Sequence, residues 1–162
     1  MIEKATLSQL PEIMAVYEKA RHFMTQTGNP DQWGKAYPPE SMIRQDILDG
    51  KCYVNLSDGK ICAVFYFALE QDPTYGYIDG AWLNDAPYGV IHRIAVGESG
   101  KGAAAACFAF AEARCDNLRI DTHEKNIPMQ RCLAKRGFRR CGIIYLEDGD
   151  PRIAYQKVVN NG

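Results

Sequence analysis

Hydrophobic positions in the N-terminal third of the chain recur three and four residues apart, which is the spacing of an amphipathic helix. The apolar stripe from Leu10 to Tyr17 predicts a helix that Ser8 would cap and that would end near Gly28. Residues 28–39 are rich in turn formers, and we expect a second, shorter helix to follow them and to end at Gly50. We interpret the stripe as the buried face of the first helix rather than as a binding site.

From residue 51 the pattern becomes that of β-strands. Two runs of β-branched and aromatic residues lie on either side of Asp58-Gly59, a dipeptide typical of two-residue hairpin turns. The second run is apolar on both alternating faces, so its strand should lie in the centre of a sheet. Residues 71–89 form a connection, and residues 90–96 form a further buried strand.

Helix and strand patterns alternate in the next part of the chain. A glycine-rich turn leads into Ala103–Arg114, whose composition favours a helix, and residues 118–122 are typical of a strand. Pro128 then starts a short helix that Gly137 ends. A strand, a helix and a strand in this order make a parallel crossover.

The C-terminal pattern is that of two strands joined by a turn at Asp148-Gly149, which gives a mixed sheet an antiparallel end. At 162 residues the chain has the length of one compact domain. We therefore predict a single α+β domain over residues 1–162, with helices on both faces of the sheet.

Composition narrows the classes of partner. The chain has 19 Lys and Arg against 20 Asp and Glu, a formal net charge of −1, which provides no field to hold a polyanion or an anionic membrane surface. Its longest apolar run, Ala103–Ala111, is shorter than the ~20 residues that a membrane-spanning helix needs. The N-terminus lacks the pattern of a secretory signal, and the six cysteines include no C-x-x-C pair. We expect a cytoplasmic protein that binds no nucleic acid, no membrane and no metal.

The glycine-rich turn after residue 96 carries the most informative chemistry. Gly97, Gly100 and Gly102 surround Lys101 where a strand ends and a helix begins. The unpaired N–H groups and the positive end of a helix point at one spot there, and missing side chains let an anion approach the backbone. The turn therefore favours phosphate binding over a tight turn without a ligand.

Two phosphate-binding patterns fit this turn in part. A P-loop would need Gly at 95 and Ser or Thr at 102, where the chain has Ala95 and Gly102, so the hydroxyl that binds magnesium is missing. A dinucleotide fingerprint, G-x-G-x-x-[GA], fits Gly100 to Ala105, with Asp121 placed 19 residues beyond Gly102. Only 41 residues follow Asp121, too few for the second half of a doubly wound sheet.

A third pattern uses more of the chain. The turn Ser99-Gly-Lys-Gly102-Ala-Ala104 is followed by Asn126, and Gly137-Phe138 comes 11 residues after Asn126. In this spacing residues 90–138 resemble the GNAT superfamily of acyl-CoA-dependent N-acetyltransferases, whose [QR]-x-x-G-x-[GA] turn cradles the coenzyme A pyrophosphate. The resemblance implies three α/β/α layers, with a mixed, splayed sheet of about six to seven strands flanked by about four helices. It also implies a homodimer.

The resemblance further implies an activity and a set of coenzyme contacts. A primary amine of an unidentified small molecule or peptide would attack the thioester of acetyl-CoA directly. By resemblance, the pantetheine, thioester and pyrophosphate would be held by Ile94, Ala95, Val96, Ser99, Gly100, Lys101, Gly102, Ala103, Ala104, Ala105 and Asn126. The alternatives are a non-catalytic acyl-CoA-binding sensor on the same fold and a dinucleotide-binding oxidoreductase.

Two departures from the family pattern concern the catalytic groups. Ser99 stands where Gln or Arg is common, and the tyrosine that many members use as general acid aligns with Leu133. An attacking amine needs a base, and His92, in the strand before the turn, is the leading candidate because imidazole titrates near neutral pH. Weaker candidates for the base are Glu98, Asp79 and Glu124, and candidates to replace the missing acid are Tyr145 and Cys132.

Aromatic residues in the predicted loops suggest where an acceptor would bind. Trp33 and Tyr37 lie in the turn-rich segment 28–39, and Tyr77 and Trp82 lie in the connection over 71–89. Exposed aromatic side chains on loops are typical of binding surfaces. We expect these four residues to form the walls of a pocket for a moderately sized amine.

Overall fold

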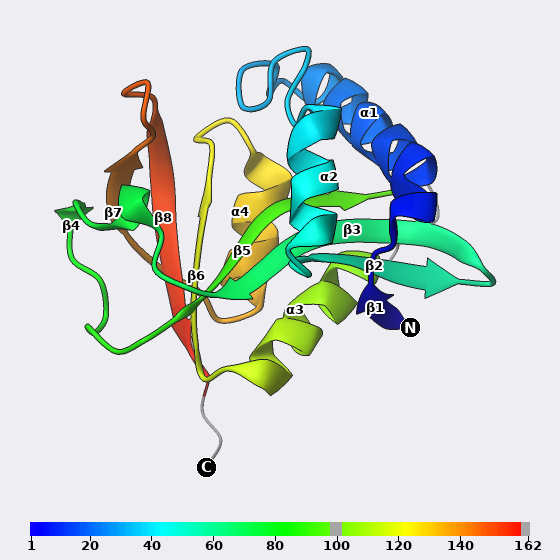
Figure 1. Ribbon diagram of the computed structural model, residues 1–162. Helices are drawn as coiled ribbons and strands as arrows, with labels where there is room; N and C mark the ends of the chain where they lie inside the picture. Colours follow the sequence, from blue (N-terminus) through cyan, green and yellow to red (C-terminus); the bar gives the residue numbers. More distant parts are fainter. Residues whose placement is uncertain (98–101, 160–162) are drawn as a thin grey trace.

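The computed structural model describes residues 1–97 and 102–159 and contains helices packed on both faces of one mixed sheet (Figure 1). The helices of the described residues are η1 (Leu7–Gln9), α1 (Leu10–Gln26), α2 (Glu40–Leu48), η2 (Pro73–Tyr75), α3 (Ala103–Arg114) and α4 (Ile127–Lys135), where η marks a 3-10 helix. The strands are β1 (Ile2–Lys4), β2 (Cys52–Ser57), β3 (Lys60–Leu69), β4 (Asp79–Gly80), β5 (Gly89–Val96), β6 (Asn117–Thr122), β7 (Arg139–Tyr145) and β8 (Pro151–Val158).

The eight strands of the described residues follow the order β1-β2-β3-β5-β6-β8-β7-β4. Among the described strands only β5 and β6 pair in parallel, because α3 carries the chain from one to the other across a face of the sheet. The predicted crossover and antiparallel end are therefore confirmed. The short strand β4 lies in the segment that we expected to be a plain connection, and two residues give no periodicity to detect.

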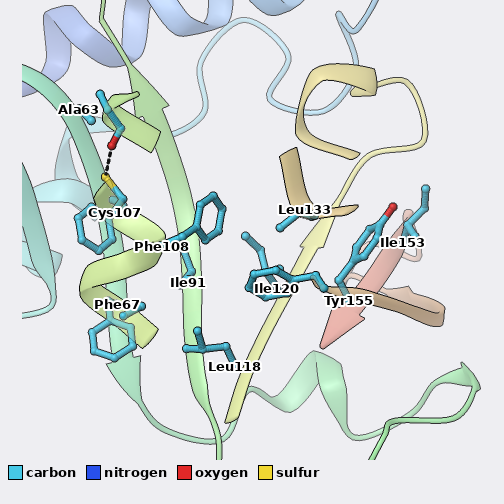
Figure 2. Close-up of a cluster of buried hydrophobic side chains, with 14 of the residues drawn as sticks. Ala63, Phe67, Ile91, Cys107, Phe108, Leu118, Ile120, Leu133, Ile153 and Tyr155 are labelled. Carbon is cyan, nitrogen blue, oxygen red and sulfur yellow. Dashed lines mark hydrogen bonds between the residues drawn. The ribbon is translucent and has the colours of Figure 1, made fainter. Parts of the chain in front are cut away.

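An apolar core on each face of the sheet holds the helices of that face against the strands. Helices α1 and α2 bury one set of side chains against β2 and β3, and the fully buried Ile13 confirms the predicted stripe of α1. Helices α3 and α4 cover the opposite face, where Phe108 of α3 and Leu133 of α4 share a cluster with β3, β5, β6 and β8 (Figure 2). The prediction that Ser8 caps the first helix is wrong, because Ser8 lies inside η1, which precedes α1. In the described part of the chain, every helix is too short or too polar to cross a bilayer.

The sheet opens between its two parallel strands. The ladder between β5 and β6 consists of Gly89 with Leu118 and Val90 with Arg119, and no further pairs join these strands in the described residues. Beyond Val90 the two strands run apart, as Figure 1 shows for the green β5 and the yellow β6. This opening is the splay that the family resemblance implies, and it leaves one edge of β5 without a partner strand.

Strand β5 carries an extra residue at the opening. Val64 of β3 lies opposite Ala95 of β5, and Tyr66 lies opposite His92. These pairs are two residues apart on β3 but three residues apart on β5. Arg93, inside this bulge, has a φ of 49°, a left-handed conformation that non-glycine residues rarely adopt. A conformation of this kind costs about 1–3 kcal/mol and persists only where surrounding contacts enforce it.

Candidate active site

A cavity of about 700 Å³ occupies the opening between β5 and β6. It is lined along β5 by residues 91–94, along β6 by residues 120–122, and at its sides by the loop 31–37 and by segment 70–74. The strands thus supply rigid walls, and the loops close the cavity from one side. This cavity is the natural candidate for a binding site in a fold whose central sheet splits.

The lining of the cavity includes residues that point to both faces of the sheet. Side chains alternate along β6, so Ile120 and Thr122 point to the face of α3 and α4, whereas Asp121 points to the opposite face. Asp121 accepts a hydrogen bond of 2.7 Å from the hydroxyl of Tyr75 on that opposite face. Because all three β6 residues line the cavity, side chains from both faces of the sheet border it.

A histidine and a carboxylate meet in this cavity. The Nε2 atom of His92 lies 2.8 Å from Oδ2 of Asp72, and both side chains are mostly buried. Burial alone would raise the pKa of the Asp72 carboxyl, but hydrogen bonds from His92 and Thr74 outweigh it and lower the pKa to about 2. The carboxylate is therefore ionised at neutral pH and can only accept a hydrogen bond.

The ionised state of Asp72 fixes the tautomer of the neutral imidazole. Nε2 of His92 must carry the proton that it donates to Asp72, which leaves the lone pair on Nδ1. Among the described residues, Nδ1 has no hydrogen-bond partner in the protein. His92 is thus oriented by a carboxylate and can accept a proton from a ligand in the cavity.

Acidic side chains predominate around the cavity. Two of them are paired, Glu70 with Lys51 at 2.7 Å and Asp31 with Lys125 at 2.9 Å. The described lining contains two guanidinium groups and six carboxylates: Arg93, Arg152, Asp31, Glu70, Asp72, Asp121, Asp148 and Asp150. Even after both lysines are counted, carboxylates outnumber cations, so the field in the cavity favours a cationic ligand.

Arg152 borders the cavity, and both Nη atoms of its guanidinium group bond to the protein. Its Nη1 atom donates to Asp150 at 3.0 Å, and its Nη2 atom donates to the carbonyl of Gln32 at 3.2 Å. This buried arginine therefore ties β8 to the loop 31–37. We assign it a structural role in holding that loop against the cavity.

The expected coenzyme contacts fall on two features of the structure. Ile94 lines the cavity on the open edge of β5, whereas the side chains of Ala95 and Val96 pack into the cores on either face. Gly102, with a φ of 82°, precedes α3, whose first N–H groups have no partner within the helix. Those N–H groups belong to Ala103, Ala104 and Ala105, and Ser99, Gly100 and Lys101 lie outside the described residues, as does Glu98.

Asn126 lies at the edge of the cavity and caps α4. Its Oδ1 atom accepts from the backbone N–H of Met129 at 3.1 Å, and its Nδ2 atom donates to Gln32 at 2.9 Å. The turn-and-cap role therefore accounts for both ends of its side chain. A contact of Asn126 with the pantetheine remains an expectation of the resemblance alone.

The aromatic residues expected around the acceptor divide into two groups. Trp33 and Tyr37 line the cavity, but Trp33 is buried, because its ring packs against those of Tyr17 and Tyr37 at 5.8 and 6.1 Å. The expected exposure of Trp33 is wrong for this reason. Neither Tyr77 nor Trp82 lines the cavity.

The weaker catalytic candidates lie away from the cavity lining. Tyr145 is on β7 with its ring 6.3 Å from that of Tyr77, and Cys132 packs against the core under α4. Asp79 and Glu124 are exposed side chains outside the lining. Leu133 is fully buried in the core, so the position of the family's tyrosine faces no ligand.

Two residues of the cavity, Asp72 and Thr122, were not predicted from the sequence. Asp72 precedes Pro73, and its Oδ1 atom accepts from the N–H of Thr74, so the sequence signal was that of a local cap before a 3-10 helix. Nothing local connects it with His92, twenty positions away. Thr122 ends a predicted strand, and its burial depends on the packing of β6 between β5 and β8.

Comparison with known proteins supports the same fold and family. A solved acetyltransferase of the GNAT family from Streptococcus agalactiae 2603 has a TM-score of 0.88 and 32% sequence identity, over 99% of this chain and 96% of that one. A GNAT-family acetyltransferase from Listeria monocytogenes 4b F2365 has a TM-score of 0.72 and 18% identity, over 98% and 94% of the two chains. The ribosomal-protein-S18-alanine N-acetyltransferase from Escherichia coli has a TM-score of 0.64 and 16% identity, over 100% and 96%.

The two structures at lower identity establish the fold alone. No family model matches the sequence, and neither does any curated protein. The similarity to the Streptococcus agalactiae structure, in contrast, spans nearly the whole of both chains at 32% identity. Together with the split sheet and its cavity, this similarity shows that the chain belongs to the GNAT family of acetyltransferases.

Proposed function

We propose that this protein is an acetyl-CoA-dependent N-acetyltransferase in which a primary amine of a small molecule or peptide attacks the acetyl thioester directly. The observation that carries the proposal is the pair of His92 and Asp72 inside a cavity that residues from both faces of the sheet border. A donor bound on the α3 side and an acceptor bound on the opposite side would meet there. Direct attack is the mechanism that the family resemblance implies.

His92 would act as the general base. An alkylamine with a pKa of ~10.4 is about 3.4 units away from deprotonation at pH 7, so exposing its lone pair costs about 4.6 kcal/mol. Nδ1 of His92 would take the amine proton, and Asp72, through Nε2, would stabilise the imidazolium that forms. Asp72 is then a positioning residue and His92 a catalytic residue.

The charges around the cavity support an amine as the acceptor. Most amines reach the protein as ammonium ions, and the carboxylates of Asp121 and Asp148 line the cavity without a salt bridge to a lysine or arginine among the described residues, although the charge of Arg152 acts on Asp121. Such a field attracts a cation and repels a carboxylate or phosphate acceptor. Tyr37 and Trp33 would supply apolar contact for the carbon skeleton of the acceptor.

The structure offers suitable places for acetyl-CoA, whose chemical contribution is an activated acetyl thioester. The unpaired edge of β5 at Ile94 could hydrogen-bond an extended, amide-containing chain, as a missing strand would. The N–H groups that open α3 at Ala103 could bind phosphate oxygens. The N–H groups of Ile94 and Val96, next to the bulge and on the open edge of β5, are candidate donors to the thioester oxygen, whereas the N–H of Ala95 faces β3 as that of Gly97 does.

Thiol release on mixing the protein with acetyl-CoA and a panel of amines tests the proposal. We expect turnover by the wild type and a loss of about 10² or more in kcat/KM for His92→Gln, the usual contribution of a general base. A thermal-shift series with acetyl-CoA, NAD and ATP in parallel should show stabilisation by acetyl-CoA. Binding without turnover across the panel would favour an acyl-CoA sensor, and stabilisation by NAD alone would favour an oxidoreductase; either result contradicts the proposal.

A further inference from the structure

The hydroxyl group of one residue that lines the cavity has no hydrogen-bond partner. Thr122 is fully buried, and its Oγ1 atom contacts no donor or acceptor. Four buried side-chain atoms of the described residues share this property, and they belong to Asn29, Arg119, Thr122 and Arg136. Of these four residues, only Thr122 lines the cavity between β5 and β6. A buried hydroxyl without a partner reduces the stability of the fold by about 1–3 kcal/mol. Such a group is explained by a ligand that supplies the missing hydrogen bond.

The position of Thr122 in the sheet specifies which ligand atom it would meet. The β5–β6 ladder ends at Val90 and Arg119, and three residues further along each strand come Arg93 and Thr122. Thr122 therefore lies across the opening from the bulge of β5. It also lies on the face of α3 and α4, the side that the proposed function gives to the acyl donor.

The same face lacks the hydroxyl that the family resemblance would place there. Leu133 occupies that position, and it is fully buried in the cluster that also holds Ile120 (Figure 2). Thr122 is two residues beyond Ile120 on β6 and shares its face, so it continues this surface toward the open end of the cavity. A hydroxyl is thus present on the face of the sheet that also holds the position where a tyrosine is missing.

We propose that the Thr122 hydroxyl donates a hydrogen bond to the sulfur of the departing coenzyme A thiolate. The inference rests on the proposed function. Nδ1 of His92 takes one proton from the ammonium group, the freed amine nitrogen bonds to the thioester carbon, and the carbon–sulfur bond breaks with its electron pair on sulfur. The second proton, which the nitrogen loses as it becomes an amide, passes to solvent. Thr122 keeps its own proton and stabilises the negative sulfur, which later takes a proton from solvent. Thr122 is in this sense a catalytic residue that offsets the absence of a tyrosine at position 133.

Binding of coenzyme A and of desulfo-coenzyme A, which lacks the sulfur, tests the inference without turnover. In calorimetric titrations the wild type should bind coenzyme A about tenfold more tightly than the desulfo analogue, the value of one hydrogen bond to a charged acceptor. The preference should increase from pH 7 to pH 9 as the thiolate forms. Thr122→Val should abolish the preference, and Thr122→Ser should keep it.

Stability and activity complete the test. Thr122→Val should melt no lower than the wild type, because it replaces an unpartnered buried hydroxyl by a methyl group, and its kcat should fall about tenfold. Thr25→Val is the matched control, because the Thr25 hydroxyl donates to the carbonyl of Arg21 on the exposed surface of α1. It should change neither the melting temperature nor kcat. If the wild type binds coenzyme A and turns over while Thr122→Val behaves like it, the role of Thr122 is wrong and the proposed function stands. If the wild type neither binds coenzyme A nor turns over, both the role of Thr122 and the proposed function are wrong.

Discussion

Arg93 and Asp46 form a two-pronged ion pair that links the bulge of β5 to helix α2. The Nε and Nη2 atoms of Arg93 each donate a hydrogen bond of 3.0 Å to the Asp46 carboxylate. The carbonyl of Arg93 accepts a further hydrogen bond of 2.7 Å from Tyr17 of α1. Both helices on this face therefore hold the left-handed residue of the bulge, which sets the direction of the backbone beside the cavity.

We expect Asp46→Asn to destabilise the protein by about 1–3 kcal/mol, because it leaves the mostly buried guanidinium without its counter-charge. Burial raises the pKa of the Asp46 carboxyl, so removal of its charge offsets part of this loss. Chemical denaturation measures this change. The kcat should fall as well, since the bulge is no longer enforced from α2. Asp49→Asn, at an exposed residue that ends the same helix, is the control and should change both quantities little. Equal stability of the two variants would show that Asp46 does not hold the bulge.

Asp72→Asn should abolish most of the activity while leaving His92 in place. The amide can donate to Nε2, which would move the ring proton to Nδ1 and remove the lone pair that faces the cavity. We expect kcat/KM to fall about 10²-fold, with the remaining activity shifted along the pH axis, because no carboxylate stabilises the imidazolium. Asp58→Asn, in the distant β2–β3 turn, controls for the loss of one charge. An unchanged pH–rate profile for Asp72→Asn would remove this carboxylate from the mechanism.

Asp121→Asn should stabilise the protein at neutral pH. Burial raises the pKa of the Asp121 carboxyl, although the charge of His92 and the hydrogen bond from Tyr75 partly oppose the rise. A carboxyl with a raised pKa in the folded state stabilises the protein while it is protonated and loses this contribution as the pH rises through that pKa. The asparagine has no charge to bury and can still accept from Tyr75, so its melting temperature should exceed that of the wild type by a few degrees at pH 7. This advantage should shrink as the pH approaches 4, and an advantage that is the same at both pH values would contradict the role of burial.

Local periodicity and turn chemistry predicted most of the fold, because both are encoded by neighbouring residues. The Asp58-Gly59 turn, the strand over 90–96 and the helix after Gly102 lie where the sequence placed them. The bulge at Arg93 could not be predicted, since it depends on a salt bridge to a residue of α2 that lies 47 positions away in the sequence.

The sequence predicted a residue of the candidate site only where that residue lies within a recognisable strand. His92 was identified because it belongs to the strand before the glycine-rich turn, and the structure places it in the cavity. Its partner Asp72 arrives from a loop whose local pattern indicates only a cap. The burial of Trp33 likewise depends on the packing of a loop against α1, which side-chain type alone does not reveal.

The N-terminus of α3 provides the last prediction, with a matched control in the hairpin. Gly102 and Gly59 have φ values of 82° and 75°, and a Cβ atom at either position would meet no neighbour within 4 Å in the described structure. Substitution by alanine should therefore destabilise both variants by a similar amount, about 1 kcal/mol, through the backbone conformation alone. Only Gly102→Ala changes the residue that opens α3, so only this variant should bind coenzyme A several-fold more weakly in calorimetric titrations. Equal affinity in both variants would show that the start of α3 does not bind the coenzyme.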